Sequence, residues 1–175
     1  VNMIIGAGYG GIPAMTATSG PGLSLMSESM GLAVASETPM VILNVMRGGP
    51  STGIPTKSEQ GDFNIAVYGL HGDAPHIVLA PTSVSDNYQT MALATYFATY
   101  YQTLVIVLSD QFLGQSMQVF DGVPSTDLKA SFVKPQTSSQ LLDEVEHFQR
   151  YLDNHSGISP MAVPGDSDCF FTADQ

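Results

Sequence analysis

Short apolar runs alternate with longer helix-like segments along this chain, and Gly, Pro or Ser separates them. Residues 40–45 (MVILNV) and 103–108 (TLVIVL) are rich in β-branched side chains, which is typical of strands buried on both faces. Two further strands are predicted, at residues 14–18 and 76–79. Because strands that alternate with helices form βαβ units, we predict an α/β fold in which helices flank a parallel sheet.

Helical spacing of apolar residues predicts crossover helices between these strands. Residues 23–36 follow a glycine-rich turn at 19–22, and residues 83–101 begin at Ser83, a plausible N-cap with Asp86 three residues on. Right-handed crossovers bring the strand-to-helix loops to the carboxyl edge of one sheet, where ligands bind in open α/β folds.

Shorter helices are predicted elsewhere in the chain. One is predicted over residues 60–69, and capping of this helix is the default role for acids placed as Glu59 and Asp62 are. One or two helical turns are expected after Asp110, and residues 140–152 carry a further apolar stripe.

Composition changes near residue 122. We predict one domain over residues 1–122, and over 123–175 a linker, a helix and the start of a following domain. The chain opens on Val1 rather than Met, directly in an apolar stretch, so we expect a segment to be missing upstream.

Charge and cysteine content exclude several classes of function. Only 12% of the residues are charged, which predicts extensive contact with other protein. The net charge is −11 with five scattered basic residues, so nucleic-acid binding is not expected. A single cysteine, Cys169, cannot hold an iron–sulfur cluster or form an internal disulfide. No apolar run approaches the ~20 residues of a membrane span, and we expect a cytoplasmic protein.

The turn at residues 19–22 (SGPG) follows the first predicted strand. Its glycines let the backbone turn sharply into a helix N-terminus, whose free N–H groups can bind a phosphate, a carboxylate or a loop of another subunit. The alternative is a tight turn that needs glycine only for packing.

Arg47 is the only arginine in the first 149 residues, and it follows a predicted buried strand in a loop of Gly, Pro, Ser and Thr. Its five donors match a carboxylate, and such a charge-assisted pair contributes about 1.5–3 kcal/mol. The alternative is an ion pair with Glu59 or Asp62. Hydroxyl groups that add uncharged donors to this loop are those of Ser51, Thr52 and Thr56.

The loop at residues 71–76 (HGDAPH) contains two histidines and an aspartate. Its spacing matches no metal motif, so we predict a surface or packing role, with His71 near an active site as the alternative. Ser19 and Ser51 lack a nucleophile elbow, and hydrolase chemistry is not predicted.

Four segments together resemble the α subunit of 2-oxoacid:ferredoxin oxidoreductases, especially the 2-oxoglutarate type. They are residues 16–22 (TATSGPG), 47–56 (RGGPSTGIPT), 59–62 (EQGD) and 71–73 (HGD). The resemblance runs over essentially the whole chain. It implies the pyrimidine-type thiamin-diphosphate-binding domain.

This resemblance also implies a reaction and its partners. The implied reaction is oxidative decarboxylation of a 2-oxoacid, with 2-oxoglutarate as the expected substrate, to acyl-CoA and CO₂ with reduction of ferredoxin. In such enzymes the α subunit receives the aminopyrimidine ring. The β subunit holds the diphosphate, Mg²⁺ and an iron–sulfur cluster, so a hetero-oligomer is expected.

The resemblance assigns roles to particular residues. Arg47 matches the arginine that holds the substrate carboxylate, and Thr52 would line the same pocket. Ile54 falls where an apolar residue presses against the cofactor, and the cofactor-binding turn is Ser19, Gly20 and Pro21.

No catalytic or metal-binding residue is expected on this chain. The family's Tyr-Pro-x-Thr-Pro segment and the glutamate that activates the aminopyrimidine precede the point where the chain begins, and Glu28, Glu37 and Glu59 do not occupy that position. The first alternative is therefore a non-catalytic α/β binding or assembly module derived from the same family. The second is part of another thiamin enzyme, such as a transketolase-like half.

Overall fold

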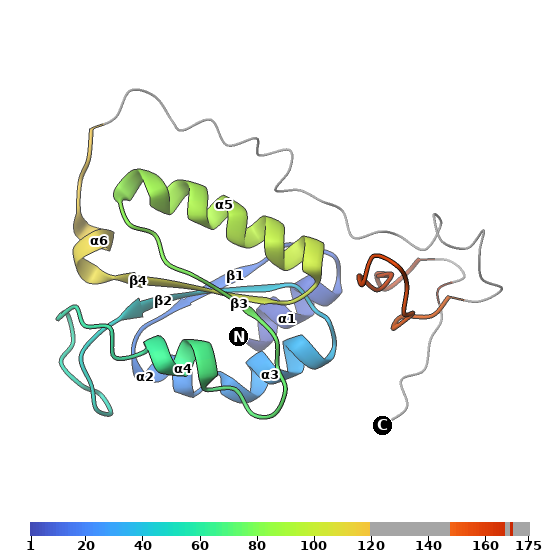
Figure 1. Ribbon diagram of the computed structural model, residues 1–175, viewed down its shortest axis with the longest axis horizontal. Coiled ribbons are helices and arrows are strands. Elements are labelled where there is room, and N and C mark those ends of the chain that lie inside the picture. The colour runs from blue at the N-terminus through green and yellow to red at the C-terminus, as the bar shows by residue number, and fades with distance from the viewer. Residues whose placement is uncertain (120–147, 167–168, 170–175) are drawn as a thin grey trace.

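The computed structural model describes residues 1–119, 148–166 and 169, and within them a parallel four-stranded sheet lies between two layers of helices (Figure 1). The strands are β1 (Met15–Thr18), β2 (Met40–Met46), β3 (Ile77–Leu79) and β4 (Leu104–Asp110). Their order in the sheet is β1-β2-β4-β3, and every neighbouring pair is parallel. The predicted α/β fold and its strands are confirmed.

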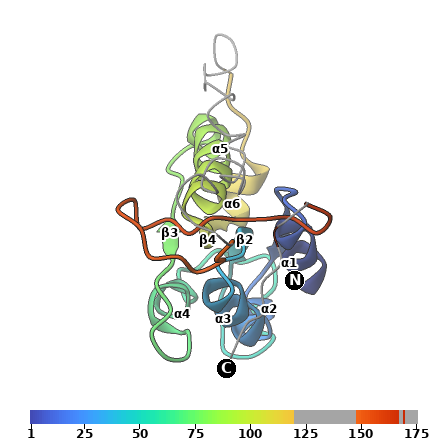
Figure 2. The same cartoon turned by 90° about the vertical axis from the view of Figure 1, so that its right-hand side faces the viewer.

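The six helices of the described residues pack on both faces of this sheet. Helix α5 (Val84–Tyr101) covers one face, while α3 (Ser27–Ala35) and α4 (Phe63–Tyr68) cover the other (Figures 1 and 2). The remaining helices are α1 (Asn2–Tyr9), α2 (Pro21–Ser24) and α6 (Gln111–Gln115). None of the described helices has both the length and the apolar character that crossing a bilayer requires.

The two central strands are buried on both faces because helices cover both. Val105 and Val107 of β4 pack in the α5 layer, whereas Leu104, Ile106 and Leu108 pack in the opposite layer. A fully buried aliphatic side chain of this kind contributes about 1.5–3 kcal/mol. This explains why β2 and β4 are continuous apolar runs rather than alternating ones.

One helix was predicted over residues 23–36, and the structure corrects it to two. The helix breaks between α2 and α3, where the Met26 N–H bonds to the Leu23 carbonyl at 3.0 Å, a tightened turn. The Ser27 hydroxyl donates to the Ser24 carbonyl at 3.0 Å and so occupies an acceptor at the break.

Helix α1 was not predicted, because two glycines, Gly6 and Gly8, interrupt its apolar sequence. Its position depends on one of them. A Cβ on Gly8 would lie 2.4 Å from the Pro39 carbonyl oxygen, so only glycine allows α1 to approach the start of β2 this closely.

The predicted cap of α5 is confirmed, since the Ser83 hydroxyl accepts from the Asp86 N–H at 3.1 Å. The turns expected after Asp110 are α6, and the Asp110 carboxylate accepts from the Leu113 N–H at 2.8 Å.

The helix predicted over 60–69 begins later, at Phe63, and neither Glu59 nor Asp62 caps it with its side chain. That capping prediction is wrong, and the Asp62 carboxylate instead accepts a hydrogen bond from Asn44.

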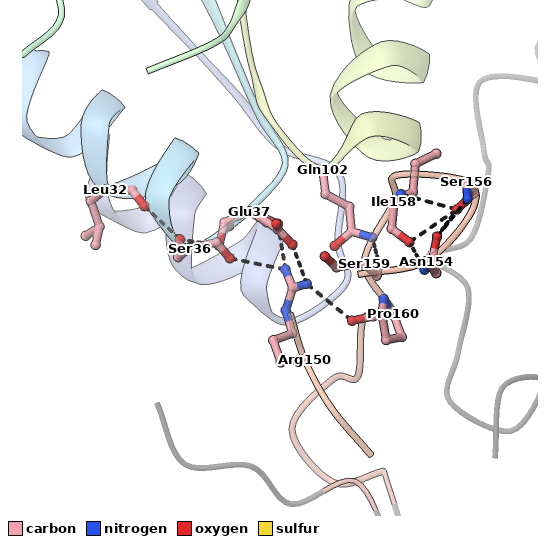
Figure 3. Close-up of polar contacts among 11 residues, drawn as sticks. Leu32, Ser36, Glu37, Gln102, Arg150, Asn154, Ser156, Ile158, Ser159 and Pro160 are labelled. Atoms are coloured by element: carbon pink, nitrogen blue, oxygen red, sulfur yellow. Dashed lines mark hydrogen bonds and ion pairs between the residues drawn. The ribbon is translucent and has the colours of Figure 1, made fainter. Parts of the chain in front are cut away.

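Residues 148–166 pack against the amino edge of the sheet (Figure 2). The buried Arg150 guanidinium pairs with the Glu37 carboxylate at 3.0 Å and donates to the carbonyls of Ser36, Glu37 and Pro160 (Figure 3). The Gln102 amide donates to the Ser159 carbonyl at 2.5 Å.

Residues 148–152 are not helical, which corrects the end of the helix predicted over 140–152. The Arg150 guanidinium reaches backbone carbonyls of two other segments, and these contacts hold the chain in an irregular path. Residues 140–147 lie outside the described part of the chain.

Candidate active site

The loops that follow β1 and β2 meet at the carboxyl edge of the sheet, where they enclose a cavity of about 520 Å³. The first loop leads into α2, and the second runs from Arg47 to Asp62 and leads into α4. The lining residues are Gly20, Pro21, Ser24, Leu25, Arg47, Gly48, Gly49, Pro50, Ser51, Gly61, Asp62 and Ile65. The two loops singled out in the sequence therefore form one site.

The turn after β1 is fixed to the neighbouring strand. The Ser19 hydroxyl donates to the Val45 carbonyl at 2.7 Å, which ties the turn to the end of β2. Pro21 is the first residue of α2, where its fixed φ suits a helix start. Ser19 thus supports the site, while Gly20 and Pro21 line it.

Gly20 makes room for the Arg47 side chain. Its φ is 54°, in the left-handed region that favours glycine, and an added Cβ would lie 2.8 Å from Arg47 Nε and 3.0 Å from Arg47 Cγ. Glycine is required here for a close approach as well as for the turn.

The Arg47 guanidinium has no ion pair and no hydrogen bond within the part of the chain that the structure describes, and its Nε is buried without a partner. The alternative ion pair with Glu59 or Asp62 is therefore not found among these residues. A buried donor left without an acceptor costs about 1–3 kcal/mol, so the arrangement favours an acceptor that enters the cavity.

The loop after β2 folds back on itself. The Gly48 N–H donates to the Lys57 carbonyl at 3.1 Å, and the Ile54 N–H donates to the Gly48 carbonyl at 3.0 Å. Ser51 and Thr56 have φ of 57° and 65°, values that side chains with a Cβ rarely adopt. Such backbone strain concentrates at functional sites.

Thr52 and Ile54 lie in this loop but do not line the cavity. Thr52 is exposed, and Ile54 is 57% exposed. The structure therefore places the two outer residues of the expected site on the surface beside it.

Asp62 is a lining residue that the sequence analysis misinterpreted. Its carboxylate accepts a hydrogen bond from Asn44 Nδ2 at 3.0 Å, and this contact replaces the predicted cap. Asn44 lies in β2, and Asp62 is 8% exposed. The only sequence signal was a single amide inside the apolar run MVILNVM.

Unpartnered polar atoms gather at this edge of the sheet. The described residues contain four buried side-chain polar atoms without a partner, and three of them lie at this edge. Asn44 Oδ1 is in the carboxyl half of β2, Arg47 Nε directly follows β2, and Gln111 Oε1 directly follows β4. The edge is also braced, because the Phe112 N–H donates to the Ser58 hydroxyl at 3.2 Å. Buried polar groups are normally satisfied, so this concentration marks a site that binds something.

The loop at 71–76 lies elsewhere. His71 and Asp73 are exposed and line a different cavity, next to α3. Both ring nitrogens of His76 contact backbone carbonyls at 2.7 Å, those of Ala74 and Ala66, which is a packing role. Within the described ranges no three His, Cys, Asp or Glu residues are grouped as a metal site would need.

Comparison with known proteins gives one family over most of the chain. A family model described as "Pyruvate flavodoxin/ferredoxin oxidoreductase, thiamine diP-bdg" matches residues 1–156. The 2-oxoglutarate synthase subunit KorA of Archaeoglobus fulgidus is 56% identical over 114 residues, 65% of this chain and 33% of that protein. The 2-oxoglutarate oxidoreductase subunit KorA of Mycobacterium tuberculosis is 41% identical over 166 residues, 92% of this chain and 24% of that protein.

A solved structure has the same fold. It is that of the 2-oxoglutarate:ferredoxin oxidoreductase from Magnetococcus marinus with 2-oxoglutarate, coenzyme A and succinyl-CoA bound, and its TM-score to this chain is 0.87 at 42% identity. The match covers 99% of this chain and 29% of that one. The chain thus spans 24–33% of the length of these three proteins.

Proposed function

Because the chain belongs to the family of thiamin-diphosphate-binding domains of pyruvate flavodoxin/ferredoxin oxidoreductases, we propose that it forms part of the α subunit of a 2-oxoacid:ferredoxin oxidoreductase. The reaction is the oxidative decarboxylation of a 2-oxoacid with coenzyme A, which yields acyl-CoA and CO₂ and passes two electrons to ferredoxin. The names of the relatives favour 2-oxoglutarate as the substrate.

The observation that carries this proposal is the Arg47 guanidinium. It lines the cavity, it has no partner among the described residues, and its Nε is buried. A substrate carboxylate supplies the missing acceptor, and a charge-assisted pair holds the acid in one orientation. Arg47 therefore binds and orients the substrate and takes no part in proton transfer.

The residues around Arg47 suit a cofactor that lies across the carboxyl edge. Thiamin diphosphate, when bound, supplies the nucleophilic carbon for attack on the 2-oxo group. Gly20 leaves space that any larger residue would fill, Pro21 fixes the start of α2, and Ser19 holds the turn on β2. The exposed Ile54 side chain offers an apolar contact to the ring, and we assign Thr52 to the part of the pocket that a partner closes.

The remaining chemistry belongs to other chains in this proposal. A β subunit holds the diphosphate, Mg²⁺ and an iron–sulfur cluster, the roles that the resemblance to 2-oxoacid:ferredoxin oxidoreductases implies for it. The assembly is a hetero-oligomer in the cytoplasm, and ferredoxin accepts the electrons.

Removal of the guanidinium tests this function. We expect Arg47→Ala in the complete α subunit, assembled with its β partner, to raise KM for 2-oxoglutarate and to lower kcat/KM about 10- to 100-fold, which corresponds to the loss of one charge-assisted pair. The assay is anaerobic reduction of a viologen dye with 2-oxoglutarate and coenzyme A.

Lys57→Ala is the matched control, because Lys57 is a cation of the same loop that is exposed and does not line the cavity. Its kinetics should equal those of the wild type. Normal kinetics in the Arg47 variant would remove Arg47 from the site. No dye reduction by the wild-type assembly would instead favour a non-catalytic binding or assembly module.

A further inference from the structure

Asp62 does not do what its place in the sequence predicts. It occupies the N-cap position of α4, yet its backbone is helical, with φ −88° and ψ −3°, and its side chain makes no capping hydrogen bond. An aspartate at this position usually stabilises a helix by accepting from a backbone N–H. The contribution is forgone here, so the carboxylate is held in place for another reason.

The group that holds it is itself unusual. Asn44 lies in the central strand β2 with no exposed surface, and its Nδ2 donates to Asp62 Oδ2 at 3.0 Å. The other end of the amide, Oδ1, is buried without a partner. An amide in a buried strand costs free energy unless both ends are satisfied, and an apolar residue would avoid that cost. The strand therefore carries a polar residue whose one hydrogen bond orients Asp62.

The oriented carboxylate faces the cavity of Arg47. Asp62 is the only acid and Arg47 the only cation among the lining residues. No ion pair joins them, although both line the same 520 Å³. Each charge consequently acts on whatever occupies the cavity. Their fields are strong there, because a partly dehydrated cavity screens charges less than water does.

We propose that Asp62 is a specificity-determining residue, which restricts the ligand group beside Arg47 to a single negative charge. The proposal rests on the proposed function and extends it to the class of ligand. A 2-oxoacid fits this rule, because its carboxylate is followed by a neutral oxo group. A second carboxylate directly beside the first is repelled by Asp62, so any further acidic group must lie farther along the substrate.

Oxamate and oxalate test the rule with a change of one charge. Both have a carboxylate on a two-carbon frame, neither carries the reacting ketone, and they differ only in an amide against a second carboxylate. Their dissociation constants are measured by calorimetry on the assembled enzyme. We expect the wild type to bind oxamate more tightly than oxalate. In Asp62→Asn the affinity for oxalate should rise about tenfold relative to oxamate, the size expected for one nearby charge.

The substitution is chosen to separate charge from structure. An asparagine at 62 still offers a carbonyl oxygen to Asn44 Nδ2, so the orientation of the loop is kept while the charge is removed. Asp73→Asn is the control, since Asp73 is an exposed acid that lines a different cavity. It should leave the oxamate-to-oxalate ratio unchanged.

Three results would overturn the proposal: an unchanged ratio in a folded Asp62→Asn enzyme, an equal change in Asp73→Asn, or failure of both Asp62→Asn and Asp62→Ser to assemble. The last result would make the carboxylate a structural requirement. Arg47→Ala in the same calorimeter keeps the two ideas apart. If it still binds oxamate, the proposed substrate site is wrong. If it loses oxamate while Asp62→Asn keeps the wild-type ratio, only the role of Asp62 is wrong.

Discussion

Single residues at the carboxyl edge are coupled through space rather than through sequence. Gly20 and Arg47 belong to different loops, yet the absence of a Cβ on Gly20 creates the room that Arg47 occupies. The guanidinium cannot reach its position if that room is filled. Substrate binding should therefore depend on a glycine that itself has no group with which to bind.

We expect Gly20→Ala to raise KM for the 2-oxoacid about tenfold or more, because the new Cβ would lie 2.8 Å from Arg47 Nε. It should also lower the free energy of unfolding by about 1 kcal/mol, since φ is 54°. The measurements are steady-state kinetics and thermal unfolding. Gly31→Ala is the control, because a Cβ on Gly31 of α3 meets nothing within 4 Å, and it should leave KM unchanged. A wild-type KM in the Gly20 variant would contradict the coupling.

Sequence could identify Arg47 but not the surroundings of Asp62. A lone arginine after a buried strand stands out by type and place, so its role could be proposed without coordinates. Asp62 was interpreted from its neighbours along the chain, which predict a helix cap. Its actual partner is Asn44, 18 residues earlier, on a strand that approaches it only in the folded chain.

At the scale of elements, α5 has the best-defined start. The Ser83 hydroxyl accepts from the Asp86 N–H, and the Asp86 carboxylate accepts from the Thr82 N–H at 2.7 Å. That backbone hydrogen bond is the main reason why the pKa of Asp86 lies below its usual value of 3.8, and hydroxyl groups of Thr82 and Thr90 add to the effect.

The start of α5 should make stability depend on pH in the acid range. A carboxyl group with a lowered folded-state pKa stabilises the fold above the unfolded pKa, and this contribution is lost as pH falls through the folded value. Asp86→Ala should therefore be less stable than the wild type at neutral pH, and the two should converge as pH falls below about 3.8. Denaturation at several pH values measures this. Asp73→Ala, which removes an exposed acid, is the control, and a constant difference for Asp86→Ala at all pH values would contradict the linkage.

Elements were predictable where the local pattern alone decides them. Helix α5 has both a cap and a long apolar stripe, and β2 and β4 are uninterrupted apolar runs. The break between α2 and α3 was missed because helical spacing continues across it. Helix α1 was missed because its glycines argue against a helix, while its packing against Pro39 depends on one of them.

At the scale of the whole molecule, the order of the strands was not predictable. Alternation of strands and helices implies a parallel sheet, but it does not say that β4 lies between β2 and β3. That order places the loops after β1 and β2 side by side, which forms the cavity. Residues 148–166 lie at the amino edge of the sheet, at the end opposite the site (Figure 1).

Arg150 should therefore stabilise the molecule without affecting substrate binding. Its guanidinium is buried, and most of its hydrogen bonds go to backbone carbonyls, including those of Ser36 and Glu37 at the end of α3 (Figure 3). A cation at a helix C-terminus satisfies carbonyls that the helix leaves free. We expect Arg150→Ala to lower the free energy of unfolding by about 2–4 kcal/mol, and its KM for the 2-oxoacid to equal that of the wild type.

Glu37→Gly separates the ion pair from the carbonyl contacts. The Glu37 side chain is 37% exposed, so its pairing with Arg150 contributes less than a buried pair would. Its backbone has φ 51°, a conformation that glycine adopts without strain. We therefore expect Glu37→Gly to unfold within about 1 kcal/mol of the wild type, because relief of backbone strain offsets the lost pair. If chemical denaturation shows that Glu37→Gly loses as much stability as Arg150→Ala, then the ion pair, rather than the bonds to carbonyls, holds residues 148–166 on the sheet.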